Sequence, residues 1–381
     1  MANPILNLGN NEWATKSESL LSYSKSGSNF KPVPFTHSRA SVGTTTDRNG
    51  VVETILGDTP RIDFQDNEKG ALLLEPQRTN ELRYTEDFTN AFWNKQGGSS
   101  VTSNTTTAPN GTLTADTLSG ATGTDVSGDV LRLNVYYINV ESTLSIYCKS
   151  LGSDNLTIYI RNGSNGSVAS ESISLSNEWQ RIDLTSNPAT GQIFFGNTNG
   201  DVAIWGAQME AGDYPTSYIP TEASSVTRLK DECINGGNVD LFDISEGTLF
   251  VDANNFGTPL NGYFMITLSD GGSNFVRFLY ESSRIRTSVY NGATQSDYFI
   301  TGVNDNERNK VAITFKENEF KTYLNGVLKD TDTSGVVPTN FDRLNFASQS
   351  GTSRHFEGEV YQTLVFSEAL SDSELQTLTT L

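Results

Sequence analysis

The chain has 381 residues, of which 45 are acidic and 26 basic, so its formal net charge is −19. This length predicts two or three domains. The charge disfavours binding to nucleic acid, because such binding depends on Lys and Arg side chains that neutralise phosphates. No apolar run reaches the ~18 residues that span a bilayer. The N-terminus shows no basic and apolar signal peptide, so we expect synthesis in a cytoplasm and no membrane insertion.

The composition predicts an all-β protein. Aromatic residues make up 10% of the chain, and Gly is frequent with 33 residues. Short alternating runs bounded by polar turns recur, whereas helical periodicity is almost absent. Cys148 and Cys233 fall in different predicted modules, so no disulfide framework is expected.

The first 83 residues predict two small segments. Residues 1–34 are polar and irregular, and a terminal segment of this kind is loosely ordered unless a partner holds it. Residues 35–83 contain short predicted strands and turns rich in Asp, Asn, Gly and Pro. This second segment is too small for a core of its own, so we expect it to pack on a neighbouring domain or subunit.

Residues 84–228 predict a β-sandwich. Apolar side chains alternate with period two over residues 144–148, 156–160 and 180–184, which is typical of strands with one buried face. Residues 202–205 are almost continuously apolar, as in a central strand.

Residues 229–381 predict a second sandwich. Alternation over 249–253 and 311–315 indicates strands, and Asn325-Gly326 between two apolar pairs is a strong hairpin signal. Ser371 and Glu374 form a capping box, which predicts that a short helix begins there.

Several short phrases together resemble one family. They are Phe35-Thr36, Arg39-Ala40-Ser41, Thr59-Pro60-Arg61-Ile62-Asp63-Phe64, Gly70-Ala71-Leu72-Leu73-Leu74-Glu75-Pro76, Arg78-Thr79-Asn80, Tyr84-Thr85-Glu86-Asp87-Phe88, Ile204-Trp205-Gly206-Ala207-Gln208-Met209-Glu210 and Pro215-Thr216-Ser217-Tyr218-Ile219-Pro220. The combination resembles modular phage virion proteins of the tail-fibre, head-fibre or spike type, which carry carbohydrate-binding-like jelly rolls. The end of the chain, with Asn325-Gly326 and Ala369-Leu370-Ser371-Asp372, resembles the concanavalin A-like/laminin G-like fold.

The resemblance implies an organisation and a function. It implies a docking segment over residues 1–34 that contacts other virion proteins, a short-strand module over 35–83, a jelly roll over 84–228 and a concanavalin A-like domain over 229–381. A homotrimer located in the virion and adhesion to host-surface or environmental glycans follow from the same likeness, without enzymatic activity. Two alternatives stay open: a capsid or tail decoration protein that binds no sugar, and a glycan depolymerase with paired carboxylates.

Aromatic rings and planar polar side chains are the groups that bind sugars. Candidates for a shallow glycan site, on or near loops, are Trp93, Tyr280, Arg284, Tyr290 and Tyr298. No cofactor is expected, but calcium has one candidate loop. Asp330, Asp332 and Ser334 match the start of a calcium-binding loop, yet its twelfth position is Phe341 instead of the bidentate Glu. A polar turn explains the same residues.

Overall fold

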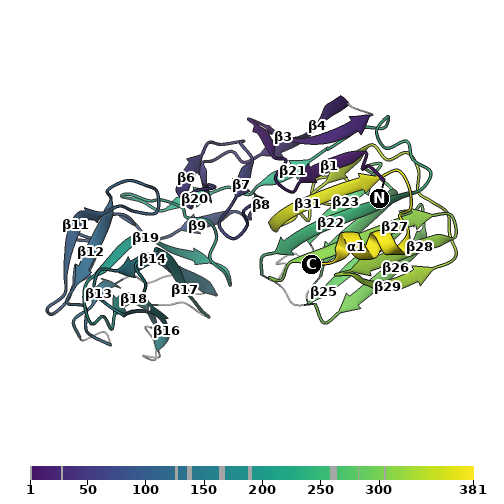
Figure 1. The fold of residues 1–381 in the computed structure, drawn as a ribbon. Coiled ribbons are helices and arrows are strands. Elements are labelled where there is room, and N and C mark those ends of the chain that lie inside the picture. Colours follow the sequence, from purple (N-terminus) through teal and green to yellow (C-terminus); the bar gives the residue numbers. More distant parts are fainter. Residues whose placement is uncertain are drawn as a thin grey trace. The chain divides into compact units, whose positions relative to one another are not determined.

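The computed structural model describes residues 2–26, 29–124, 128–134, 140–162, 168–187, 191–257, 264–281, 283–303 and 306–381, and its strands confirm the all-β prediction (Figure 1). The chain divides into two compact units. Unit 1 contains Met1–Arg48, Ile55–Pro76 and Lys230–Leu381, and unit 2 contains Asn49–Thr54 and Gln77–Leu229. Each unit is a β-sandwich, but unit 1 is assembled from three stretches of sequence.

Unit 2 is built from two five-stranded sheets. The first has the order β10 (Asn94–Lys95), β13 (Leu131–Asn134), β18 (Gly191–Gly196), β15 (Asn155–Asn162) and β16 (Val168–Ser174). The second has the order β11 (Ser100–Thr106), β12 (Ala115–Ser119), β19 (Val202–Ala211), β14 (Ser142–Ser150) and β17 (Gln180–Ser186). The alternating apolar side chains of β14 and β15 meet in one core, as period-two patterning requires. A short ladder joins β9 (Arg78–Asn80) to β20 (Val226–Arg228).

Unit 1 contains a 12-stranded sheet and a five-stranded sheet. The main path of the larger sheet is β21 (Glu232–Ile234), β4 (Asn29–Ser38), β3 (Ser19–Ser26), β1 (Leu6–Gly9), β31 (Gly358–Phe366), β22 (Gly247–Asn255), β27 (Asn309–Lys316), β28 (Glu319–Leu324) and β29 (Val327–Asp332). Beside this path, β2 (Ala14–Lys16) pairs with β3, β8 (Ala71–Leu74) with β31, and β7 (Arg61–Asp63) with β8.

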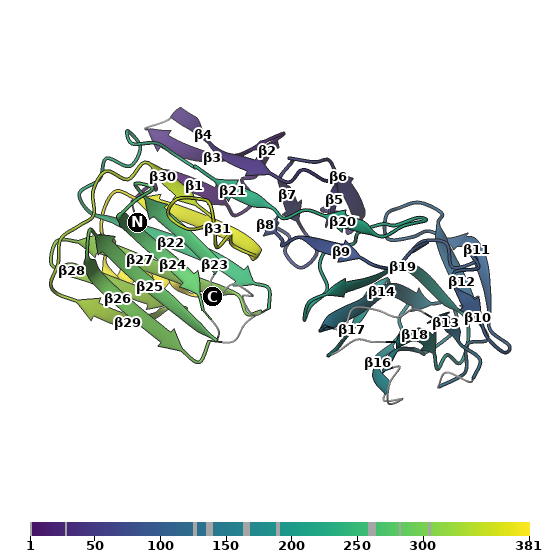
Figure 2. The same cartoon turned by 180° about the vertical axis from the view of Figure 1, so that it is seen from behind.

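The smaller sheet of unit 1 has the order β26 (Thr294–Thr301), β25 (Arg284–Asn291), β24 (Asn274–Tyr280), β23 (Phe264–Ser269) and β30 (Arg343–Asn345), and its strands are visible from behind in Figure 2. Apolar side chains of β22 and β27 share one core with those of β24 and β25. The predicted alternation over 249–253 and 311–315 therefore supplies the inner face of this sandwich. Outside both sheets, β5 (Gly43–Thr46) lies in unit 1, and β6 (Val52–Ile55) spans the point where the units divide.

The N-terminal residues differ from the expectation of a loose, separate segment. Leu6 lies opposite Val365 in the pairing of β1 with β31, and β3 forms a long antiparallel pair with β4. Leu6, Leu8 and Leu20 are fully buried in the core of unit 1. These few apolar side chains are enough to anchor the N-terminal strands, because the neighbouring strands cover them. Strands β1, β3 and β4 are thus part of the sandwich of unit 1 and not a module beside it.

The short-strand stretch over residues 35–83 is held by buried charges. Arg39, Arg61, Glu75 and Asp231 are all at most 3% exposed. Arg61 lies 2.6 Å from a carboxylate oxygen of Glu75, and Asp231 contacts both Arg39 and Arg61. The backbone amide of Glu75 also donates to Asp231 over 3.0 Å. Three of the phrases that carry the family resemblance therefore contribute the charged residues of one structural cluster inside unit 1.

The predicted helix begins where its capping box lies. Helix α1 spans Asp372–Thr379, and the side chain of Glu374 accepts from the backbone amide of Ser371 over 3.0 Å. Leu370 and Leu375 pack with Phe250 and Tyr323 on the outer face of the larger sheet. Across the described ranges, no helix has the length and apolar character needed to cross a membrane.

Candidate functional site

One face of the smaller sheet in unit 1 presents rings and charged groups to the outside. On β24 and β25, Val276, Phe278, Ile285 and Val289 point into the core. Because side chains alternate between the two faces of a strand, the intervening residues point outward. We call the group formed by Phe275, Arg277, Arg284, Arg286, Ser288, Tyr290, Asp297 and Phe299 the open face.

The first row of the open face is aromatic. Phe275 and Tyr290 are partners across β24 and β25, and their rings stack at a centroid distance of 5.1 Å and an angle of 5°. The guanidinium of Arg277 lies 4.6 Å from the centroid of the Phe275 ring. Phe275 is buried beneath these contacts, whereas Tyr290 stays half-buried. Tyr290 is thus a supported ring at the border of the face.

The second feature is a bonded network of polar side chains. Arg286 donates two hydrogen bonds to Asp297, over 2.7 and 2.6 Å, and the hydroxyl of Ser288 donates to the same carboxylate over 2.8 Å. Burial alone would raise the pKa of Asp297. The bonds from Arg286 and Ser288 and the charge of Arg286 outweigh burial and hold this pKa below its ordinary value. Asp297 is therefore an anion with a fixed orientation.

Phe299 completes the face on the edge strand β26. Its ring is 39% exposed, and the guanidinium groups of Arg284 and Arg286 lie 4.5 and 4.7 Å from its centroid. The face therefore combines the exposed ring of Phe299 and the half-buried ring of Tyr290 with planar hydrogen-bonding groups that are already held in place. This arrangement suits a flat, polyhydroxylated ligand, because little side-chain entropy is lost when such groups bind.

The structure separates the five residues that the sequence proposed for sugar binding. Arg284 and Tyr290 are both on the open face, near opposite ends of strand β25. Tyr280 is 1% exposed, and its hydroxyl donates to the carbonyl of Ala253 over 3.1 Å. Tyr298 packs against the same core. Tyr280 and Tyr298 therefore face the inside of the sandwich and offer no ring to an outside ligand.

Trp93 is a core residue of unit 2. It is 1% exposed, its indole N–H donates to the carbonyl of Tyr84 over 3.0 Å, and its ring packs against Phe88 and Phe195. A hollow of about 590 Å³ lies beside it, lined also by Arg83, Phe92 and Lys95. Burial leaves the ring face of Trp93 covered, so its expected stacking role finds no support. The loop-like sequence around Trp93 suggested an exposed ring, but the ring packs in the core.

Sequence reasoning missed most of the open face: Phe275, Arg277, Arg286, Ser288, Asp297 and Phe299. The signal that could have identified them is the alternation of inward-facing and outward-facing side chains along each strand. Arg284, Arg286, Ser288 and Tyr290 are out of phase with Ile285 and Val289, which predicts that they share the outer face. Which strands lie next to each other could not be deduced from that pattern.

The proposed calcium loop forms a polar turn. Both the backbone amide and the hydroxyl of Ser334 donate to Asp332 over 3.0 Å. Burial, the largest cause, raises the pKa of Asp330, and the charge of Asp332 acts in the same direction. Within the described part of the chain, no group of three or more His, Cys, Asp or Glu side chains is placed to hold a metal ion. The calcium hypothesis for Asp330, Asp332 and Ser334 therefore gains no support.

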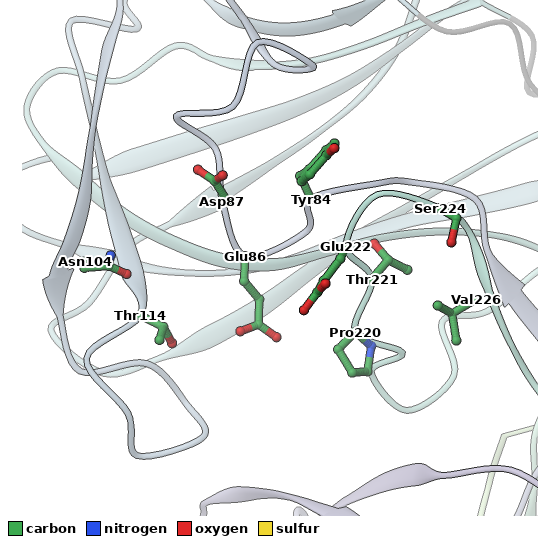
Figure 3. Close-up of a pocket in the computed structure, with 10 residues that line it drawn as sticks. All are labelled: Tyr84, Glu86, Asp87, Asn104, Thr114, Pro220, Thr221, Glu222, Ser224 and Val226. Carbon is green, nitrogen blue, oxygen red and sulfur yellow. The ribbon is translucent and has the colours of Figure 1, made fainter.

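Unit 2 contains a cleft of about 760 Å³ (Figure 3). Its walls come from four segments that are distant in sequence: the turn after β9, strand β11, the approach to β12 and the segment before β20. The lining residues are Tyr84, Glu86, Asp87, Asn104, Thr114, Pro220, Thr221, Glu222, Ser224 and Val226. Nothing in the sequence pattern marked this cleft, because its residues belong to turns and strand ends.

The C-terminal part of unit 1 contains a concanavalin A-like domain. Residues 247–376 match the sequence profile of the Concanavalin A-like lectin/glucanases superfamily. The open face lies within these residues. No curated protein sequence is significantly similar to the chain.

Several solved structures match part of this chain at low sequence identity. The CBM40 domain of the Ruminococcus gnavus IT-sialidase, bound to α2,3-sialyllactose, is 16% identical and covers 37% of this chain and 86% of its own, with a TM-score of 0.33. Domain 4 of the arabinanase AbnA from Geobacillus stearothermophilus, in complex with arabinotriose, is 12% identical and covers 45% and 84%, with a TM-score of 0.28. Sheep galectin-11 in complex with glycerol is 14% identical and covers 32% and 88%, with a TM-score of 0.23.

Proposed function

We propose that this protein binds glycans through the open face of unit 1. The observation that carries the proposal is the Arg286–Asp297–Ser288 network beside the ring of Tyr290, on a domain that matches the Concanavalin A-like lectin/glucanases superfamily. Ser288 is buried and holds Asp297 from below. The fixed carboxylate and guanidinium groups are complementary to sugar hydroxyls, and a supported ring offers an apolar surface to a pyranose. A single shallow site of this kind binds weakly, so repeated display on a particle would make it effective.

We further propose that the particle is a phage virion and that the chain is a fibre- or spike-type component of it. The phrases between Phe35 and Tyr218 that resemble such proteins support this role. A homotrimer and contacts with other virion proteins belong to the same proposal. Since β1 to β4 are built into unit 1, a virion partner of residues 1–34 would contact a folded strand edge or loop and not a loose segment.

A glycan array with the full chain tests the binding function. We expect hits from the wild-type protein and about 10-fold weaker binding by Tyr290→Ala, because the loss of one stacking ring is worth ~1 kcal/mol or more. Lys316→Ala is the control, since Lys316 lies outside the open face and its side chain is 53% exposed. The absence of hits for a chain with a normal melting transition would favour a decoration protein that binds no sugar.

The virion role has its own experiment. A cryo-EM reconstruction of the assembled particle should reveal the chain projecting outward with the open face exposed. Finding it flat against the shell, with Tyr290 and Phe299 covered by neighbouring subunits, would overturn the adhesin role and support a structural one.

The depolymerase alternative has one observation in its favour. Glu86 and Glu222 line the same cleft in unit 2, and burial, helped by the charge of Glu222, raises the pKa of Glu86. A glycoside hydrolase needs two carboxylates, one of them protonated. Release of reducing ends from host polysaccharide by the wild type, lost in Glu86→Gln, would establish hydrolysis. Unchanged polysaccharide would support the non-enzymatic proposal.

A further inference from the structure

The cleft of unit 2 differs in chemistry from the open face. Its ten lining residues include three carboxylates, from Glu86, Asp87 and Glu222, and no Lys, Arg or His. Its volume, about 760 Å³, lies within the range of small-ligand sites. The cleft can therefore hold a ligand of one or a few sugar units, but it repels an anionic one.

Backbone hydrogen bonds fix the wall that carries the two glutamates. The amide of Tyr84 donates to the carbonyl of Glu222 over 2.8 Å, and the amide of Thr85 donates to the carbonyl of Thr221 over 3.3 Å. The hydroxyl of Thr221 donates in turn to the carbonyl of Leu82 over 2.8 Å. Glu222 is bonded in this short ladder to Tyr84, and Glu86 directly follows the second bonded residue, Thr85. Figure 3 shows the side chains of Glu86 and Glu222 extending in the same direction, between Thr114 and Pro220.

Buried groups behind the wall hold Glu86 in place. The hydroxyl of Tyr218 donates to a carboxylate oxygen of Glu86 over 3.1 Å and is bonded also to the hydroxyl of Thr85. The indole N–H of Trp205, which is 1% exposed, has no partner at hydrogen-bonding distance among the described atoms. The nearby Trp205 side chain favours the charged form of the Glu86 carboxyl. The bond from Tyr218 thus holds in place a carboxylate that lines the cleft.

The remaining lining groups are those of a sugar site. Tyr84 provides a half-buried ring at the cleft, and Asn104, Thr114 and Ser224 provide an amide and hydroxyl groups. Asp87 accepts from Thr89 over 2.6 Å within its own turn and points away from the two glutamates in Figure 3. We therefore take Glu86 and Glu222 as the carboxylates that meet a ligand.

We propose that this cleft is a second saccharide site, which binds an amine-bearing sugar with its ammonium group between Glu86 and Glu222. The inference rests on the proposed glycan-binding function but concerns a different unit of the chain. An ammonium group forms charge-assisted hydrogen bonds with both carboxylates, which relieves the repulsion between them. The hydroxyl groups and the ring of Tyr84 bind the sugar skeleton.

Isothermal titration calorimetry on the full chain tests the proposal with three probes. They are the β-1,4-linked glucosamine trimer, its fully N-acetylated form and a galacturonate trimer of the same length. The wild type should bind the free-amine trimer more tightly than the N-acetylated trimer and should not bind the acidic one. Equal affinity for the acetylated and free-amine trimers, or no binding of the free-amine trimer, would overturn the proposal.

Two variants test whether the free-amine trimer binds in the cleft. Glu222 is exposed, so Glu222→Gln should keep the fold. The loss of one charge-assisted hydrogen bond should lower the affinity for the free-amine trimer about 10-fold. Glu178→Gln is the matched control, because Glu178 is an exposed glutamate of unit 2 outside the cleft. Unchanged affinity in Glu222→Gln would contradict the assignment.

Failure of this inference is distinguishable from failure of the proposed function. Tyr290→Ala should leave binding of the free-amine trimer unchanged, while it weakens the array hits of the open face. If Tyr290→Ala lost trimer binding while Glu222→Gln bound the trimer with wild-type affinity, the ligand would bind at the open face instead. That result would overturn the cleft and leave the proposed function intact.

Discussion

Asp231 and Arg39 lie 192 positions apart in the chain, and their side chains meet over 2.9 Å with no exposure to solvent. Arg39 also donates to the carbonyls of Ser41, Thr59 and Leu56. The pair therefore connects the short-strand stretch to the start of the C-terminal segment. Burial would raise the pKa of Asp231, but the charges of Arg61 and Arg39 and the nearby His37 imidazole, 3.4 Å away, hold it far below the ordinary value.

We expect Asp231→Asn to destabilise unit 1 strongly. The substitution leaves Arg39 and Arg61 buried with one carboxylate too few, and removal of one partner from a buried ion pair costs ~3–5 kcal/mol. Urea unfolding followed by the fluorescence of Trp13, the tryptophan of unit 1, measures the loss. Lys316→Ala breaks an exposed pair with Glu246 and should change the free energy of unfolding by less than ~1 kcal/mol. A similar loss in both variants would contradict the structural role of the cluster.

The same pair predicts acid sensitivity. Because the pKa of Asp231 is lower in the folded chain than in the unfolded one, its contribution is present above the unfolded pKa of ~3.9 and is lost as pH falls below it. The melting temperature of the wild type should therefore fall steeply below about pH 4. Asp231→Asn, where folded, should show a shallower fall over that interval.

The carboxyl group of Glu359 should give the stability of the folded chain the opposite pH dependence. Burial, together with the charges of Asp63, Asp66 and Glu75, raises its pKa from 4.5 to about 7. An acid whose pKa is raised on folding destabilises the folded chain as pH increases from the unfolded to the folded pKa. Glu359→Gln should therefore increase the melting temperature at pH 8 and leave it unchanged at pH 4, where both forms are neutral. Its partner Tyr361 can still donate to the Gln oxygen. An equal shift at both pH values would show that ionisation is not the cause.

Trp93 and Tyr290 should respond in opposite ways to truncation. Trp93→Ala removes a buried ring from the core of unit 2 and should cost ~3–5 kcal/mol of unfolding free energy, while the array hits of the open face persist. Tyr290→Ala should weaken those hits with a smaller loss of stability, because its ring is half-buried. Thermal unfolding and glycan binding of the two variants, measured in parallel, test whether Trp93 is a core residue and Tyr290 a ligand residue. Loss of glycan binding in Trp93→Ala at intact stability would restore its candidacy as a ligand residue.

Calcium removal should have no effect on stability. Asp332 is bonded to Ser334 within its own turn, and within the described part of the chain no metal-binding group of His, Cys, Asp or Glu is found. We expect the melting temperature to be the same in EDTA and in excess calcium. An increase with calcium that Asp332→Ala abolishes would establish the site that the sequence suggested.

The parity of the strands explains which site residues could have been predicted. Tyr280 is in phase with Val276 and Phe278, so its burial follows from alternation along β24. Tyr290 is out of phase with Ile285 and Val289, which predicts its outward position. Aromatic identity alone could not separate the two tyrosines, because both sides of a strand accept rings.

Local sequence determined the features that depend on neighbouring residues: strand alternation in both sandwiches, the Asn325-Gly326 hairpin between β28 and β29, and the capping box of α1. The all-β class follows from these patterns.

Only the tertiary structure decided which distant segments meet. Pairing of β1 with β31 brings the N-terminal strands into the C-terminal sandwich, and Asp231 meets Arg39 from a segment 192 positions away. In the same way the cleft brings together Glu86 and Glu222, whose segments are joined by the backbone bonds of Tyr84 and Thr85. Such contacts depend on strand order and on the burial of whole surfaces, which no short window of residues encodes.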